Sequence, residues 1–448
     1  MLNKAILMKE SSLDLRKIII LTVVTSIFFL ALVMRMGMVN QTEMPYPIRN
    51  DAKEYYSYAI NFITTGIYSN KYPLKTPPEH LTPDQRRPPG YPLFLMPFVE
   101  YPPNLSMVKK ITSAQAVISS FTVLLCFFLF RLFLTTSLAI LGMLFVAISP
   151  HLIAMDIYIL TESLFTFFLV SLAYCMSKLI LKSDKRWAYI LGVILGISLL
   201  IKPTMIYFIF FLFFGMFFLI PNKDYKKLIF IILIGYLTSY GPWVIYKNIA
   251  LGEKPSSLSL ASLHNGMYIG LMHNNDPKTR AIPHRADPDY NKIGNMSALL
   301  TKLSTRFQEQ PVDYLKWYLV DKTIMFFSWN TVAGVGDIFI YQIFHSPYQT
   351  LGLYQVTHKA MRYLHEVFMI MGCIMALVLW LPVTKSYLSK NTLLVGRMLS
   401  IIIFYFIAVH IAGTPLPRYS IPLRPIMYAL ALLSILFLYN IAKKNVEK

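Results

Sequence analysis

The chain has 448 residues, of which 56% are hydrophobic and only 14% are charged. A soluble globular protein carries about 25% charged residues, so this composition excludes that class and indicates a protein that crosses a membrane several times. The formal net charge is +20. Because the basic residues form short clusters between apolar runs, the charge indicates membrane topology and contact with anionic lipids, and not nucleic-acid binding.

Ten apolar runs meet or approach the roughly 20 residues that a membrane-spanning helix requires. They are 18–40, 107–130, 132–149, 160–181, 187–201, 203–220, 228–246, 365–383, 398–412 and 424–441. The first run is too long for the apolar core of a signal peptide, so we expect it to be retained. The sequence therefore predicts an all-α polytopic membrane protein with about ten transmembrane helices, within a range of roughly nine to thirteen.

The basic residues fix the expected orientation, since cytoplasmic loops are enriched in Lys and Arg. With the N-terminus inside, every cytoplasmic segment is basic: Lys4, Lys9, Arg16 and Lys17; Arg131; Lys182, Lys185 and Arg186; Lys223, Lys226 and Lys227; Lys385, Lys390 and Arg397; and Lys443, Lys444 and Lys448. Two long segments, 41–106 and 247–364, are then extracytoplasmic. The expected localisation is a bacterial inner (plasma) membrane, with the functional site facing the periplasm or exterior.

This orientation divides the chain into three parts. Residues 1–246 form an N-terminal transmembrane module that includes the first outer loop, 247–364 form the large outer segment, and 365–448 form the C-terminal transmembrane helices. Both outer segments are expected to carry juxtamembrane helices. In 295–329 the apolar residues have helical spacing, which predicts amphipathic helices on the membrane surface.

The first outer loop holds the most informative charged residues. Asp51 begins a run with helical spacing that ends at Gly66, a residue typical of helix C-caps. Asp51 is thus expected near the start of a short helix, as its N-cap, as a general base, or as both, with Glu54 close by. Arg86 and Arg87 precede a Pro-Pro-Gly-Tyr-Pro turn that holds them in a set position. A guanidinium there suits a phosphate, and interfacial anchoring is the alternative.

Further ionisable residues lie at the outer ends of predicted spans. Asp156 and Glu162 lie at the outer end of the fourth span, where a carboxylate is costly and is a functional candidate. For Asp156 a solvated loop residue is the alternative, whereas Glu162 lies deeper. Lys202 is an additional candidate for binding a phosphate, and the ordinary alternative is an exposed lysine in an outer loop. Arg418 and Tyr419 lie in the last outer loop. A cation there is unexpected, because Lys and Arg are enriched in cytoplasmic loops and not in outer ones.

Metal and disulfide chemistry have no clear signal. The three cysteines, Cys126, Cys175 and Cys373, lie inside apolar runs, and the histidines match no zinc spacing. No metal ligand is therefore predicted and no cofactor is required, while a divalent metal held by the acids stays open.

Six elements, in chain order, resemble the GT-C superfamily of polytopic glycosyltransferases, in the branch with protein O-mannosyltransferases and the lipid A aminoarabinose transferase. They are Asp51 in NDAKEYYSYA, RRPPGYPLF, Ser149-Pro150 with Thr161-Glu162-Ser163, KPT after the fifth span, GPWVIYKN, and Arg418-Tyr419 with Pro422 and Pro425. They cover most of the chain. The mannosyltransferases often pair two adjacent acids in the first loop, whereas here Ala52 and Lys53 separate Asp51 from Glu54. This difference weakens an assignment to protein mannosylation.

The resemblance implies an inverting enzyme that transfers a single hexosyl or pentosyl group. The donor is a polyprenyl-phosphate-linked sugar, and the acceptor is a lipid, a glycan or a protein on the non-cytoplasmic face. Asp51 is implied as the general base, with Glu162 and Glu54 as the other catalytic candidates, and Arg87 takes the place of a phosphate-binding residue. The full set of candidates for the donor phosphate is Arg86, Arg87, Lys202, Arg418 and Tyr419.

Two alternatives belong to other classes. A lipid-linked oligosaccharide polymerase or ligase would share the donor chemistry but transfer a glycan chain. A transporter of lipid-linked sugars is disfavoured, because transporters tend to show internal repeats and polar interruptions within their spans, whereas here the spans show no obvious repeat and the charged residues gather outside.

The orientation is testable by cysteine labelling. Asn70→Cys and Asn274→Cys, each in a background without the native cysteines, should react with a membrane-impermeant thiol reagent added from outside, because both positions lie in predicted outer segments. Labelling of either position only from the cytoplasmic side would contradict the orientation.

Overall fold

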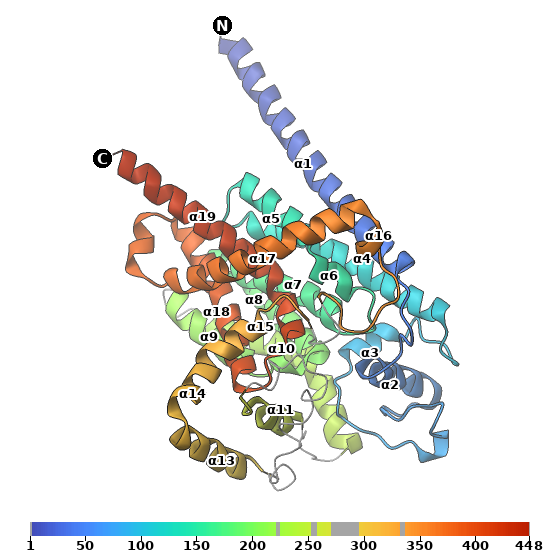
Figure 1. Ribbon diagram of the computed structural model, residues 1–448. Coiled ribbons are helices and arrows are strands. Elements are labelled where there is room, and N and C mark those ends of the chain that lie inside the picture. The colour runs from blue at the N-terminus through green and yellow to red at the C-terminus, as the bar shows by residue number, and fades with distance from the viewer. Residues whose placement is uncertain (1, 221–224, 252–257, 270–294, 332–336, 448) are drawn as a thin grey trace.

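The computed structural model describes residues 2–220, 225–251, 258–269, 295–331 and 337–447, and the regular elements in these ranges are helices (Figure 1). The longer helices are α1 (Leu2–Gln41), α4 (Leu105–Phe130), α7 (Glu162–Lys182), α8 (Lys185–Ile201), α10 (Tyr225–Leu251), α17 (Gly352–Val378), α18 (Lys390–Ala412) and α19 (Arg424–Val446). The shorter helices and helical turns are α2 (Asp51–Thr65), η1 (Pro78–His80), α3 (Gly90–Leu95), α5 (Thr136–Ile148), α6 (Pro150–Met155), η2 (Pro203–Met205), α9 (Phe208–Leu219), α11 (Leu258–Gly266), α13 (Met296–Glu309), α14 (Pro311–Lys316), η4 (Trp317–Asp321), α15 (Lys322–Phe326), α16 (Pro347–Thr350), η5 (Pro382–Ser386) and η6 (Pro417–Leu423). The predicted all-α class is confirmed. Asn274 lies outside the described residues.

Within these ranges, seven helical stretches are long and apolar enough to cross a membrane. They are Leu15–Gln41, Leu105–Phe130, Glu162–Lys182, Tyr225–Ile249, Gly352–Val378, Lys390–Ala412 and Pro417–Val446. The apolar stretches Thr136–Ile148 and Pro203–Leu219 are shorter. Each of the ten predicted runs coincides with a helix, so the polytopic architecture is confirmed, while the number of spans stays a prediction.

Some helices begin well before their predicted apolar runs, and α17 is an example. Helix α17 begins at Gly352 and not at residue 365. Its first turns carry polar side chains, among them Gln355, His358 and Lys359. Hydropathy recognises only the apolar part of a helix, so it placed the start of the span too late.

Helices α8 and α10 pack against each other along their length. A Cβ atom on Gly192 of α8 would lie only 2.1 Å from the carbonyl oxygen of Ile232, and one on Gly235 of α10 would lie 2.3 Å from that of Tyr189. Glycine at these two positions lets the backbones approach closely, which is how helices commonly associate in membranes. Lys202 follows α8 directly, so this packing fixes the position of its backbone.

A buried ion pair joins the N-terminal helices. Arg35 of α1 has its Nε 3.5 Å from Asp156 Oδ2, and the two side chains are 1% and 0% exposed. Arg35 also donates hydrogen bonds to Ser119 Oγ of α4 at 2.8 Å and to the carbonyl oxygen of Ala147 of α5 at 2.9 Å. Ser163 of α7 donates to Asp156 Oδ1 at 2.6 Å. The interpretation of Asp156 as a solvated residue is therefore wrong, since its carboxylate neutralises a guanidinium inside the bundle.

We expect Asp156→Asn to lower the free energy of unfolding by about 3–5 kcal/mol, because it leaves Arg35 charged and buried without a counter-charge. The double variant Arg35→Met/Asp156→Leu should lose clearly less, since it removes both charges. Unfolding of the purified protein in detergent measures both.

The matched control is the exposed ion pair of Lys110 and Glu100, in which Lys110 Nζ lies 2.7 Å from Glu100 Oε1. Lys110→Met should change the stability by less than about 1 kcal/mol. The single variants Arg35→Met and Asp156→Leu complete the cycle, and a double variant that loses as much stability as the two together would show that Arg35 and Asp156 do not act as a pair.

Candidate active site

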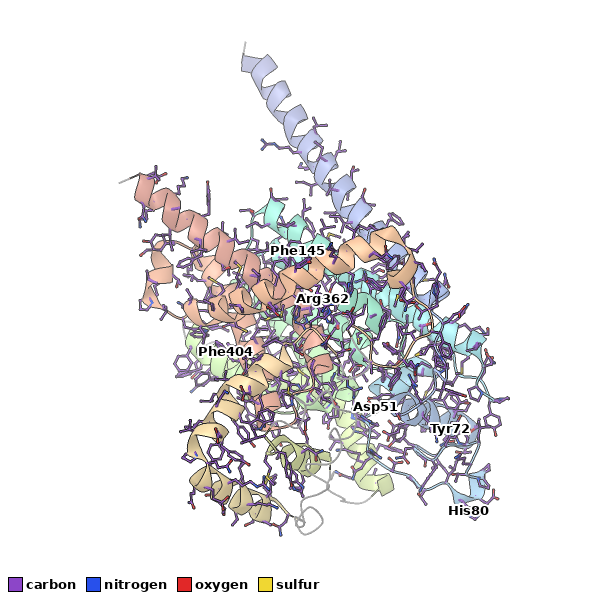
Figure 2. All side chains as sticks on the ribbon, viewed as in Figure 1. Asp51, Tyr72, His80, Phe145, Arg362 and Phe404 are labelled. Carbon is purple, nitrogen blue, oxygen red and sulfur yellow. The ribbon has the colours of Figure 1, made fainter. Side chains whose placement is uncertain are left out.

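The carboxylate of Asp51 bridges two arginines that are distant in the sequence. Its Oδ1 accepts a hydrogen bond of 2.8 Å from Arg87, and its Oδ2 accepts one of 2.8 Å from Arg418. The partners lie 36 and 367 positions away along the chain. All three side chains are partly shielded, with 25% of Asp51, 21% of Arg87 and 16% of Arg418 exposed. Figure 2 shows where Asp51 lies in the molecule, and His80 lies at the edge of the same view.

The local backbone explains why Asp51 meets these partners. It is the first residue of α2, and Asn50 precedes it with φ 48° and ψ −124°. A positive φ in a residue other than glycine is strained and is common at functional sites. At its other end, α2 stops at Gly66, which has a left-handed φ of 73°. The predicted helix start and the C-cap at Gly66 are confirmed.

The N-cap role that was left open for Asp51 is wrong. Asn50 occupies the N-cap position, and its side chain makes no capping hydrogen bond. Both carboxylate oxygens of Asp51 bind guanidinium groups instead. The reason is tertiary, because the two strong donors come from other parts of the chain.

Glu54 completes the arrangement on the side of the first loop. It lies on α2 after Asp51, and its Oε2 accepts a 2.7 Å hydrogen bond from Arg87 Nε. Its Oε1 lies 3.2 Å from Arg86, whose side chain is half exposed. The guanidinium carbon of Arg87 lies 5.2 Å from the centre of the Tyr55 ring. Arg87 is therefore held by two carboxylates and an aromatic ring.

A second, more deeply buried pair lies beside Arg418. Lys202 Nζ is 3.3 Å from Glu162 Oε1, and the two side chains are 7% and 4% exposed. The same ammonium lies 4.8 Å from the ring centre of Tyr419, whose hydroxyl accepts a 3.3 Å hydrogen bond from Arg418. The alternative of an exposed Lys202 is wrong, because Glu162 compensates its charge inside the protein. All of the predicted site residues thus belong to one connected cluster.

Opposing effects act on the pKa of Asp51. Burial raises the pKa of this carboxyl, but the charges of Arg418 and Arg87, and their hydrogen bonds, lower it by more. The pKa of Asp51 therefore lies below its ordinary value, so the group is ionised at neutral pH and gains a proton only in acid. It is a carboxylate whose basicity depends on how strongly the two arginines hold it.

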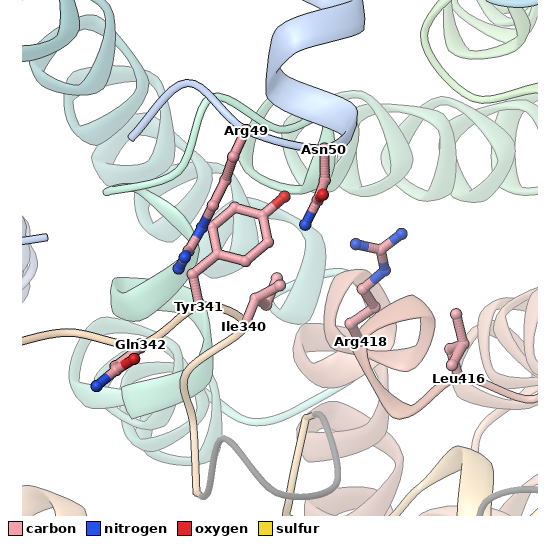
Figure 3. Close-up of a pocket in the computed structure, with 7 residues that line it drawn as sticks. All are labelled: Arg49, Asn50, Ile340, Tyr341, Gln342, Leu416 and Arg418. Carbon is pink, nitrogen blue, oxygen red and sulfur yellow. The ribbon is translucent and has the colours of Figure 1, made fainter. Parts of the chain in front are cut away.

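A pocket of about 490 Å³ opens next to this bridge (Figure 3). Its lining residues are Arg49, Asn50, Ile340, Tyr341, Gln342, Leu416 and Arg418. Its volume is in the range of about 300–1,000 Å³ that is usual for small-molecule sites. Arg418 belongs to both the pocket and the Asp51 bridge, so a ligand in the pocket lies beside the candidate base.

One wall of the pocket comes from the segment that follows residue 337. The backbone N–H of Ile340 donates a 3.1 Å hydrogen bond to the hydroxyl of Tyr158, and the backbones of Glu43 and His345 form a bridge. These contacts hold Tyr341 in the pocket that Asn50, the residue before α2, also lines. Arg49 and Tyr341 are not among the residues predicted from the sequence. The proximity of Arg49 to Asp51 in the chain was a usable signal, whereas Tyr341 has no local signal.

Among the described residues, no three His, Cys, Asp or Glu side chains come together in a way that could hold a metal ion. Both acids of the α2 cluster bind arginines, and Glu162 binds Lys202. The residues in these ranges do not fit a divalent metal, so no step below uses one.

Residues 91–246 match the dolichyl-phosphate-mannose-protein mannosyltransferase family. None of the curated proteins matches the sequence. The matched range includes Glu162 and Lys202 but not Asp51, Arg87 or Arg418.

Solved structures with similar folds include the oligosaccharyltransferase of Archaeoglobus fulgidus tethered to an acceptor peptide, with a TM-score of 0.53, 14% identity, and coverage of 93% of this chain and 49% of that one. The oligosaccharyltransferase AglB from Archaeoglobus fulgidus, in complex with an inhibitory peptide and a dolichol-phosphate, has a TM-score of 0.49, 14% identity, and coverage of 93% of this chain and 50% of that one. ArnT from Cupriavidus metallidurans bound to undecaprenyl phosphate has a TM-score of 0.40, 11% identity, and coverage of 94% of this chain and 77% of that one.

The chain therefore spans about half the length of the archaeal structures that it matches. The first of these likenesses establishes a shared fold. Together with the family match, it confirms the resemblance to the GT-C superfamily that the six sequence elements predicted. The protein is an integral membrane protein of the GT-C fold.

Proposed function

We propose that the protein is a glycosyltransferase that moves a single sugar from a polyprenyl-phosphate donor to a hydroxyl group of an acceptor, with inversion, on the non-cytoplasmic face of a bacterial inner membrane. The observation that carries this proposal is the bridge from Arg87 through Asp51 to Arg418 beside the pocket. It joins a carboxylate that can accept a proton to two guanidinium groups that can bind a phosphate. The family match supports the class of donor.

Arg418 is the first contact for the donor phosphate in this mechanism. One of its terminal nitrogens is shared between Asp51 and Tyr419, while its Nε is buried and has no partner in the described part of the structure. That Nε–H remains available to a phosphate oxygen. As the bond between the sugar and the phosphate breaks, negative charge grows on the leaving phosphate, and Arg418 and Arg87 stabilise it.

Asp51 acts as the general base. The acceptor oxygen attacks the anomeric carbon on the face opposite the phosphate, its proton passes to Asp51, and polyprenyl phosphate leaves. A bound phosphate draws positive charge of Arg418 and Arg87 away from Asp51. The pKa of Asp51 then rises from its lowered value toward the ordinary one, so the donor itself makes the base stronger.

The remaining charged residues hold Arg87 and Arg418 in position. Glu54 and Arg86 hold Arg87, and the buried pair of Glu162 and Lys202 supports Tyr419 beside Arg418. In this proposal Glu162 is a positioning residue, because its carboxylate is engaged with Lys202.

We expect Asp51→Asn to lower the transfer rate by about 10²–10⁴-fold, because the amide keeps the shape of the side chain but accepts a proton poorly. Since the pKa of Asp51 is lowered in the free protein, the wild-type rate should stay flat through neutral pH and fall only in acid, where Asp51 becomes protonated. Mass analysis of glycolipids and glycoproteins from cells with and without the protein identifies the sugar and the acceptor, and purified protein then gives the rates.

Glu54→Gln is the matched carboxylate control, since Glu54 holds Arg87 without touching the second arginine. It should reduce the rate less than Asp51→Asn does. A folded Asp51→Asn protein that transfers sugar at the wild-type rate would remove Asp51 from the role of base.

Arg418→Ala should weaken binding of polyprenyl phosphate in detergent micelles by at least about tenfold, since charge-assisted hydrogen bonds contribute about 1.5–3 kcal/mol. Arg418→Lys should restore part of the affinity, because it returns the charge without the planar fork. Arg362→Ala is the control, since Arg362 is exposed on α17 and lies apart from Asp51 in Figure 2. Equal affinity in the wild type and in Arg418→Ala would take Arg418 out of the donor site.

A further inference from the structure

The pocket contains a cation that the proposed reaction does not use. Arg49 lies on the pocket wall, and its guanidinium carbon is 4.3 Å from the ring centre of Tyr341. Arg86, Arg87, Lys202 and Arg418 each have a carboxylate within ion-pair distance. In the described ranges Arg49 has none. A stacked aromatic ring does not neutralise a charge, so the positive charge of Arg49 is open to an anion in the pocket.

Three buried polar atoms on this pocket have no hydrogen-bond partner within the described part of the chain. They are Nε of Arg49, the hydroxyl of Tyr341 and Nε of Arg418. Tyr341 as a whole is only 7% exposed. In Figure 3 its hydroxyl lies between the side chains of the two arginines. A buried polar group without a partner costs about 1–3 kcal/mol. The proposed donor phosphate provides a partner for Nε of Arg418, so the two remaining atoms, on Arg49 and Tyr341, indicate that a second ligand group completes their bonding.

The chemistry of these atoms defines the ligand. Both Nε–H groups can only donate hydrogen bonds. Burial is the largest cause that raises the pKa of Tyr341, to about 12, so its hydroxyl keeps its proton and also donates. Donors that lie beside a positive charge suit an oxyanion, either a phosphate or a carboxylate. Gln342 adds an amide that can bind a neighbouring hydroxyl group.

The two arginines take different parts of the reaction. Figure 3 shows Arg49 and Arg418 on opposite sides of the pocket. Inversion requires the leaving phosphate and the acceptor to be on opposite faces of the transferred sugar. If Arg418 holds the phosphate, the side of the pocket that carries Arg49 faces the acceptor. The donor phosphodiester carries a single negative charge, which is already shared between Arg87 and Arg418, so it does not compensate Arg49.

We propose that Arg49, Tyr341 and Gln342 form an anion subsite for the acceptor, and that the acceptor is a sugar that carries a phosphate or a carboxylate near the hydroxyl that reacts. This inference rests on the proposed function and names the substrate class of the same site. The pocket volume of about 490 Å³ suits sugar rings better than a folded protein surface.

The test compares three small probes that differ only in charge chemistry: glucose, glucose 6-phosphate and glucuronate. Binding to the purified full-length protein is measured by equilibrium dialysis. The wild type should bind at least one anionic probe about tenfold or more tightly than glucose, and Arg49→Gln should abolish that preference. Arg49→Lys should keep part of it, and Tyr341→Phe should weaken it by a smaller factor. Whether glucose 6-phosphate or glucuronate binds more tightly distinguishes a phosphate from a carboxylate.

Arg362→Gln is the matched control for the loss of one arginine, and it should bind all probes as the wild type does. Binding of polyprenyl phosphate is measured in the same variants. Arg49→Gln should retain it, which also shows that the variant is folded and that the donor site is intact.

Two outcomes would overturn the acceptor subsite while leaving the proposed function in place. One is equal binding of glucose and both anionic probes by the wild type. The other is a loss of polyprenyl phosphate binding by Arg49→Gln as large as that by Arg418→Ala, which would assign Arg49 to the donor. A wild-type protein that binds no polyprenyl phosphate would instead count against the proposed function itself.

Discussion

The bridge from Arg87 through Asp51 to Arg418 is the interaction on which the site depends. It connects α2, the loop before α3 and the turn before α19, which come from the two ends of the chain. A carboxylate between two guanidinium groups is stable when no substrate is bound, because its charge is matched on both sides. The same match lowers the pKa of Asp51, so this stability limits its strength as a base.

That opposition gives the proposed reaction its order. A phosphate that competes for Arg87 and Arg418 weakens their hold on Asp51, so the base becomes stronger only after the donor has bound. A hydroxyl that arrives first meets a carboxylate with a lowered pKa. The arrangement therefore favours binding of the donor before proton transfer from the acceptor, and it requires no moving part beyond the side chains.

Buried charges also hold the framework around the site. Arg35 with Asp156, and Lys202 with Glu162, are pairs whose members come from different elements. A charged group inside an apolar bundle is costly unless it is paired, so each pair fixes the relative position of the helices that supply it. Arg424 differs, because it donates hydrogen bonds to Ser328 O and Met369 Sδ and contacts His365 Nε2, and it thereby tethers the segment before the pocket wall to α19.

The sequence by itself determined the all-α class, the position of each apolar run, the start of α2 at Asp51 and its end at Gly66, since hydropathy and capping are local properties. It also identified Asp51, Arg87 and Arg418 as candidates. Only the tertiary structure decided that one carboxylate joins both arginines, that Lys202 is buried against Glu162, and that Arg49 and Tyr341 line the same pocket. Such contacts join residues that are from 36 to 367 positions apart, and no local pattern records which side chains meet when helices pack.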